Sequence, residues 1–156
     1  MAARRIHIAV SGAGTCGEPV RRLARAVGRE IAKRGAVLLC GGLGGAMEAA
    51  ARGAHEAGGL TVGILPGYDH CVANKWLDIV IPTGLGHARN VVLVAGGDAV
   101  IALPGEHGTT SEIALALKLG RSVVGLGAWE DNLDILHAAS PREAVALAVA
   151  AATRRT

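Results

Sequence analysis

An apolar run, a glycine-bearing turn and a helical stretch follow one another between residues 99 and 119. Residues 99–103 are entirely apolar and predict a buried strand, whereas residues 110–119 have the length and composition of a helix. Gly105 and Gly108 lie in the turn between them. Such a turn leaves helix N–H groups without intrahelical partners, and the helix dipole adds partial positive charge there. The stretch therefore predicts a site for a phosphate or another anion.

The same residues also permit a purely structural interpretation. Thr109 and Glu112 have the spacing of a capping box, in which the threonine caps the helix and the glutamate reaches back to it. In that case Glu112 stabilises the helix and takes no part in binding. Both interpretations stay open at the level of the sequence.

Strand-like and helical stretches alternate along most of the chain. Continuously apolar strands are typical of parallel sheets buried on both faces. We therefore expect one α/β domain over residues 1–156, a Rossmann-like, doubly wound, mostly parallel sheet with helices on both faces. The expected strands are residues 7–10, 36–40, 60–65, 77–81, 99–103 and 122–126. The expected helices are residues 18–33, a stretch after 45 that ends near 58, 87–95, 110–119 and 144–152, the last opened by a capping box at Ser140 and Glu143.

The composition limits how the core of such a fold is packed. Hydrophobic residues make up 51% of the chain but aromatic residues only 2%, so Ala, Val, Leu and Ile must fill the interior. The 23 glycines exceed what helix caps require, and many follow predicted strands. Because glycine lets a backbone approach a neighbouring group closely, we expect many of them to lie against a ligand.

Three glycine loops follow predicted strands, at residues 11–17, 41–45 and 105–108. Ligands of doubly wound folds bind at the carboxyl ends of the strands, so we expect these loops to converge around one phosphate. The alternative is that the glycines only permit tight strand-to-helix turns. The candidate phosphate- or nucleotide-binding residues are Ser11, Gly12, Gly41, Gly42, Gly44, Gly45, Gly105, Gly108 and Thr109.

Two common nucleotide motifs do not fit this chain. Gly12-x-Gly14-x-x-Gly17 matches the dinucleotide fingerprint, but that fingerprint needs a carboxylate at the end of the second strand. The sequence there is Leu-Leu-Cys followed by glycines. No glycine run ends in the Gly-Lys-Ser/Thr of a P-loop. We therefore expect no NAD and no other resident cofactor.

Arg89 is placed in the first turn of a helix whose remainder is too apolar to be exposed. A guanidinium at that position either extends to the edge of the core or meets an anion at the site. The alternative is a surface arginine paired with Asp98 or with the chain nearby.

The second and third glycine loops carry a family resemblance. Residues 41–47 read Gly-Gly-x-Gly-Gly-x-Met, and residues 104–112 read Pro-Gly-x-x-Gly-Thr-x-x-Glu. Over nearly the whole chain this pairing resembles the LONELY GUY phosphoribohydrolases, Rossmann-like proteins long mislabelled as lysine decarboxylases. The resemblance implies cleavage of the N-glycosidic bond of a nucleoside 5′-monophosphate, giving free base and ribose 5-phosphate.

The resemblance also assigns roles to individual residues. It implies that Arg89 and Glu112 are the catalytic pair and that Gly108 and Thr109 hold the phosphate. The residues that would complete the pocket are Ser11, Gly12, Gly44 and Gly45. Glu112 would stabilise an oxocarbenium-like ribose by its charge or by attack, and Arg89 would hold the sugar-phosphate or steady the carboxylate.

Three residues depart from the pattern of the hydrolases. Glu106 replaces a family glycine, His107 replaces the usual aromatic residue, and Asn90 follows the arginine where lysine is usual. A carboxylate beside a phosphate pocket repels a dianion unless it points away or meets a cation. Residues 86–90 look closer to a sister branch that includes molybdenum-cofactor carrier proteins, which bind a pterin monophosphate without hydrolysing it. A carrier of a phosphorylated ligand is therefore the alternative function, and a relic pocket filled by Glu106 is a third.

Other kinds of partner and site are disfavoured by the sequence. The formal charge is +3 with dispersed basic residues and no interleaved aromatics, so we expect no nucleic-acid binding. No apolar run is long enough for a membrane span, and the chain starts with charged residues in place of a signal peptide, so we expect a cytoplasmic protein. Family members are commonly dimers, and the apolar stretch 113–119 offers a face for a homodimer or higher homo-oligomer.

The cysteines and histidines do not show a metal-binding pattern. The three cysteines include no Cys-x-x-Cys, which argues against a zinc finger or a disulfide framework. His70, Cys71 and His107 are the remaining candidates, but neighbouring side chains on an extended segment point apart. We therefore expect no metal site.

Overall fold

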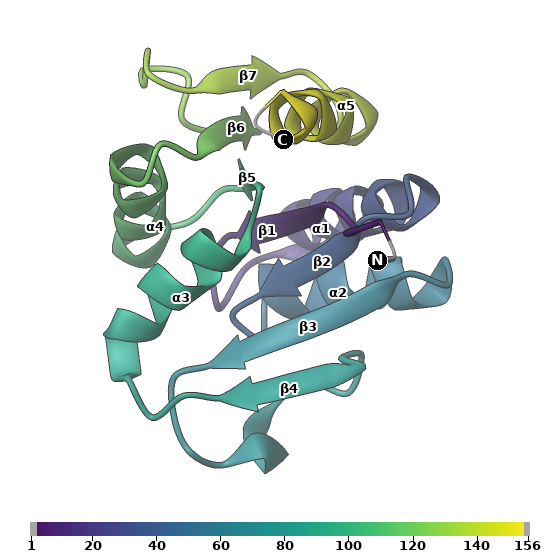
Figure 1. Cartoon of the computed structure of the whole chain (residues 1–156), viewed down its shortest axis with the longest axis vertical. Helices are drawn as coiled ribbons and strands as arrows, with labels where there is room; N and C mark the ends of the chain where they lie inside the picture. Colours follow the sequence, from purple (N-terminus) through teal and green to yellow (C-terminus); the bar gives the residue numbers. More distant parts are fainter. Residues whose placement is uncertain (1–2, 155–156) are drawn as a thin grey trace.

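The computed structural model describes residues 3–154. Seven parallel strands form one sheet in the order β4-β3-β2-β1-β5-β6-β7 (Figure 1). The strands are β1 (His7–Ser11), β2 (Val37–Cys40), β3 (Leu60–Leu65), β4 (Ile79–Pro82), β5 (Ala99–Ala102), β6 (Ser122–Leu126) and β7 (Leu136–Ala138). The expected doubly wound α/β fold is confirmed.

Helices cover both faces of this sheet. The helices are α1 (Glu18–Lys33), α2 (Ala46–Glu56), α3 (Arg89–Gly96), α4 (His107–Lys118) and α5 (Pro141–Thr153), with short 3₁₀ helices η1 (His70–Val72) and η2 (Gly86–Ala88). One hydrophobic core joins α1, α2 and α5 to the sheet, and a second core joins α3 and α4 to the opposite face (Figure 1).

Neighbouring residues of each central strand belong to different cores. In β1, Ile8 and Val10 pack toward α1 and α2, whereas Ala9 packs toward α3 and α4. Because both faces are buried, every second position must also be apolar, which explains the continuously apolar runs in the sequence.

Several glycines allow close helix packing, a role that the expectation of many glycines against a ligand did not include. A Cβ at Gly28 of α1 would collide with the Ala50 carbonyl of α2, and one at Gly53 of α2 would collide with the Arg25 carbonyl of α1. The two helices therefore touch backbone to backbone, with alanines filling the remaining space. Because the chain has no phenylalanine to fill a wide interior, close approach of the helices leaves less space for side chains to fill.

The predicted boundaries hold for most elements, with three differences. The edge strand β7 was not expected, because its three residues are exposed or half-buried and give no apolar run. Helix α4 begins at His107, three residues before the predicted start. Helix α5 begins at Pro141, also three residues before the predicted start. It has the predicted capping box: the Ser140 hydroxyl accepts from the Glu143 N–H at 3.2 Å, and the Glu143 carboxylate accepts from the Ala139 N–H at 2.7 Å.

Candidate functional site

The candidate site lies where the strand order reverses, between the carboxyl ends of β1 and β5. There Leu103 N–H donates to the Ser11 carbonyl at 2.8 Å, which extends the pairing of the two strands. Ala13 N–H then donates to the Pro104 carbonyl at 3.1 Å, and Ala46 N–H donates to the Ala13 carbonyl at 2.9 Å. The loops that follow β1, β2 and β5 therefore meet, as the sequence predicted.

A cavity of ≈ 340 Å³ opens at this meeting point. Its walls come from the loop after β1, the start of α2, the η2–α3 junction and the first turns of α4. Among the predicted site residues, those lining it are Gly12, Arg89, Gly108, Thr109 and Glu112. It is large enough for a small phosphorylated molecule.

The N-terminus of helix α4 faces this cavity. Glu106 is the N-cap residue, and its side chain makes no capping hydrogen bond. Thr109 and Glu112 therefore lie inside the helix, so the capping-box interpretation of these two residues is wrong. The N–H groups of the first helical turn have no intrahelical partner, and Gly108 and Thr109 of that turn line the cavity. The arrangement suits an anion.

Glu112 is held in place by the end of β1. Its carboxylate accepts a hydrogen bond from the Ser11 hydroxyl, and the two residues are 8% and 3% exposed. Burial raises the pKa of the Glu112 carboxyl from 4.5 to about 7, although the nearby positive charge of Arg89 acts in the opposite direction. Glu112 is therefore a carboxyl that changes protonation state near neutral pH.

Arg89 points from the start of α3 toward the sheet. Its Nη1 donates to the carbonyls of Gly41, at 2.6 Å, and Ile64, at 2.7 Å, which follow β2 and lie near the end of β3. Its Nε is buried and has no hydrogen-bond partner among residues 3–154. The alternative pairing with Asp98 is wrong, because Asp98 accepts from the Arg4 guanidinium and the His7 N–H. Burial lowers the pKa of Arg89, and the charge of Glu112 opposes that effect.

The other glycines of the predicted site lie in the loops around the cavity, where most of them leave no room for a side chain or have a positive φ. A Cβ at Gly41 would lie 2.5 Å from the Arg89 guanidinium, and one at Gly45 would collide with the backbone of residues 13–14. Gly42 has a φ of +79°, and a Cβ at Gly44 would lie 3.5 Å from the Gly14 carbonyl. A Cβ at Gly105 would collide with the Thr109 side chain. These five positions shape the loops and do not line the cavity.

The sequence matches a family model over residues 5–154, which is most of the chain. The protein belongs to the SLOG cluster4 family. An uncharacterised protein of Archaeoglobus fulgidus is 52% identical over 122 residues, which cover 78% of this chain and 80% of that protein.

This SLOG cluster4 protein is also similar to proteins of solved structure. The molybdenum cofactor binding protein of Rippkaea orientalis is 37% identical, with a TM-score of 0.88, over 96% of this chain and 98% of that one. The molybdenum cofactor carrier protein of Chlamydomonas reinhardtii is 34% identical, with a TM-score of 0.87, over 96% of this chain and 99% of that one. The sister branch inferred from residues 86–90 agrees with these neighbours.

Several cavity residues of the SLOG cluster4 protein were not predicted as binding residues. Ala13, Gly14 and Thr15 line it, and the fingerprint-like glycine spacing around them was a usable signal. Asn90 lines it while only 8% exposed, and its Nδ2 has one long hydrogen bond, 3.4 Å to the Ser111 hydroxyl. Glu106 also lines it, with its side chain exposed. Met47 and His87 complete the walls, and both belong to the stretches that carry the family resemblance, residues 41–47 and 86–90, although neither was predicted to bind.

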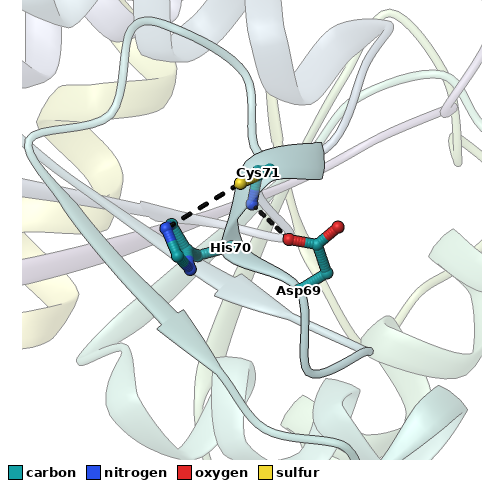
Figure 2. Close-up of side chains that lie close together, drawn as sticks. All are labelled: Asp69, His70 and Cys71. Atoms are coloured by element: carbon teal, nitrogen blue, oxygen red, sulfur yellow. Dashed lines mark hydrogen bonds between the residues drawn. The ribbon is translucent and has the colours of Figure 1, made fainter.

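Two expectations about surface groups need correction. His70 and Cys71 do not point apart, because η1 turns the chain there (Figure 2). The basic residues are also less dispersed than expected. Five of them, together with Trp76 and two glutamates, surround a hollow of ≈ 240 Å³ between α1 and α2. These five are Arg21, Arg22, Arg25, Arg52 and Lys75.

Within residues 3–154, no helix combines the length and apolar character needed to cross a membrane.

Proposed function

We propose that this SLOG cluster4 protein binds and carries a small phosphorylated ligand, with the molybdenum cofactor as the leading candidate. The observation that carries the proposal is the N-terminus of α4, which opens into the ≈ 340 Å³ cavity at the strand-order reversal. The molybdenum cofactor binding protein of Rippkaea orientalis and the molybdenum cofactor carrier protein of Chlamydomonas reinhardtii each align with 96% of this chain. They supply the identity of the candidate ligand.

Five of the cavity residues have a defined role in this proposal. The N–H groups of Gly108 and Thr109 hold the phosphate, assisted by the helix dipole. Arg89 adds a fixed positive charge from the start of α3. Asn90 has a side-chain carbonyl available to accept from a donor group of the ligand. Glu112 accepts the proton that a nearby anion favours, because its pKa already lies at about 7.

A second candidate function is hydrolysis of the N-glycosidic bond of a nucleoside 5′-monophosphate. The observation in its favour is that Glu112 and Arg89 line the same cavity and interact electrostatically. Only the ionised Glu112 carboxylate would stabilise an oxocarbenium-like ribose. With a pKa of about 7, part of the Glu112 population is protonated near neutral pH and carries no charge to stabilise such a ribose. We therefore place carriage before catalysis.

One experiment separates the two functions. Purified protein is mixed with molybdenum cofactor released from a denatured molybdoenzyme, desalted, and assayed for retained pterin fluorescence. In parallel, the protein is incubated with AMP, GMP, CMP and isopentenyl-AMP, and released base is measured by chromatography. Retained pterin without base release supports the carrier. Base release that disappears in Glu112→Gln, without pterin retention, supports the hydrolase and contradicts the carrier.

A further inference from the structure

The turn after β3 brings together three side chains of types that can ligate a metal ion, outside the candidate cavity. Asp69, His70 and Cys71 each offer one ligand atom, and these atoms all lie within 4.8 Å of one another. Figure 2 shows the imidazole of His70 directed at the thiol of Cys71, with Nε2 and Sγ 3.9 Å apart. None of the three residues lines the candidate cavity. The cluster is therefore independent of the proposed ligand pocket.

Local backbone geometry produces this convergence. Residues on a strand place successive side chains on opposite faces, whereas the 3₁₀ turn η1 rotates His70 and Cys71 toward a common side. Asp69 caps the turn: its Oδ1 accepts from the Cys71 N–H at 2.8 Å (Figure 2). That hydrogen bond places the carboxylate beside the other two groups.

The ends of the segment are fixed to the rest of the fold. Asn74 N–H donates to the Gly42 carbonyl at 2.9 Å, and its side-chain amide donates to the Leu43 carbonyl at 3.0 Å. On the other side, Gly84 N–H donates to the Gly67 carbonyl at 3.0 Å. A segment held at both ends loses less conformational freedom when it binds an ion, so these contacts favour binding.

We propose that Asp69, His70 and Cys71 form a surface site for a borderline-soft divalent cation of the Zn²⁺ class, with a fourth position open to solvent. One thiolate, one imidazole and one carboxylate is a donor set typical of Zn²⁺ and unsuited to Mg²⁺ or Ca²⁺. With bonds of about 2.3 Å to sulfur and about 2.0 Å to nitrogen, a tetrahedral ion needs its S and N donors roughly 3.5 Å apart. The distance between Cys71 Sγ and His70 Nε2 is 3.9 Å, so a small side-chain rotation would bring the two donors to the required separation. All three residues are exposed, so no packed neighbour prevents that movement.

Co²⁺ is the probe, because thiolate coordination to it gives a charge-transfer band in the near ultraviolet. Untagged, reduced, full-length protein is titrated with CoCl₂, and Zn²⁺ is then added as a competitor. We expect one Co²⁺ per chain, a thiolate band, and displacement by Zn²⁺. Cys71→Ser should remove the band. The matched control Cys16→Ser, which alters the other partly accessible thiol, should keep it.

The remaining two ligands are tested by affinity. Asp69→Asn keeps a side-chain oxygen for the Cys71 N–H but removes the charge, and His70→Gln removes the imidazole. Even outer-shell partners of a metal change affinity by about 10–100-fold, so each substitution should weaken Co²⁺ binding by at least that much. Unchanged thermal melts of the apo variants would show that the fold is intact. Absence of a thiolate band in the wild type, or a band that persists in Cys71→Ser, overturns the proposal.

Discussion

The hydroxyl of Ser11, at the end of β1, donates a hydrogen bond to the carboxyl of Glu112, in the second turn of α4. This contact joins two segments that are far apart in the sequence and fixes the one buried acidic group of the described residues in a defined orientation. It also decides between the two sequence-level interpretations of Glu112. The carboxyl lies against the sheet and the cavity and does not cap its own helix.

Burial of Glu112 should make the stability of the protein depend on pH. Its pKa is about 7 in the folded protein and near 4.5 in the unfolded chain, so the folded state binds the proton more strongly. Folding therefore gains stability below pH 4.5 and loses that gain as pH rises through 7. At about 1.4 kcal/mol per pKa unit, the loss between pH 5 and pH 8 is at most about 3 kcal/mol. Urea unfolding at the two pH values measures it.

The variant Glu112→Gln keeps an acceptor for the Ser11 hydroxyl but cannot ionise. We expect its free energy of unfolding to exceed that of the wild type at pH 8, with the difference closing by pH 5. Glu106→Gln, which alters the exposed carboxylate at the same cavity, is the control and should track the wild type. If Glu112→Gln were less stable than the wild type at both pH values, the account of a destabilising buried charge would be wrong.

Arg89 should contribute to both stability and ligand binding. Arg89→Met leaves the carbonyls of Gly41 and Ile64 without the Nη1 donor, which should destabilise the fold by about 1–3 kcal/mol. It also removes positive charge from the cavity wall, so binding of a phosphorylated ligand should weaken about tenfold or more. Chemical denaturation and equilibrium binding measure the two effects. Arg29→Met, on the exposed face of α1, should change neither.

The contact between α1 and α2 makes a prediction about glycine. Gly28→Ala places a methyl group against the Ala50 carbonyl, and the rigid backbone must shift to admit it. We expect a loss of about 1–3 kcal/mol, although alanine is the better helix former. Gly67→Ala is the matched control, since a Cβ there meets nothing within 4 Å. Equal unfolding midpoints for the two variants would contradict the close backbone packing described for these helices.

Much of this architecture could be predicted from the sequence because both faces of the sheet are buried. That burial makes β1, β2, β3, β5 and β6 predominantly apolar runs, which are easy to recognise. Strand β7 has no such pattern, because it is three residues long and lies at the edge. The start of α4 was misplaced because Thr109 and Glu112 imitate a capping box, whereas the helix begins at His107 without a side-chain cap.

The candidate site was predicted in outline but not in its internal contacts. Glycine loops after strands indicate that a ligand binds at that edge of the sheet. The positions of Arg89 and Gly41 in the sequence, however, give no sign that the arginine donates a hydrogen bond to the Gly41 carbonyl. The same limit applies to η1, where a local turn reverses the expected divergence of His70 and Cys71. Self-association, a cytoplasmic location and the absence of nucleic-acid binding stay predictions.

The most direct test of the central claim is the molybdenum and phosphorus content of the protein made in cells that synthesise molybdenum cofactor. We predict that wild-type protein and Arg29→Met retain both elements in equal amounts after gel filtration. The double variant Arg89→Met/Thr109→Val, which removes a positive charge and a hydroxyl from two residues that line the cavity, should lose both while remaining folded. Folded wild-type protein free of molybdenum, or equal content in the double variant, would contradict the account.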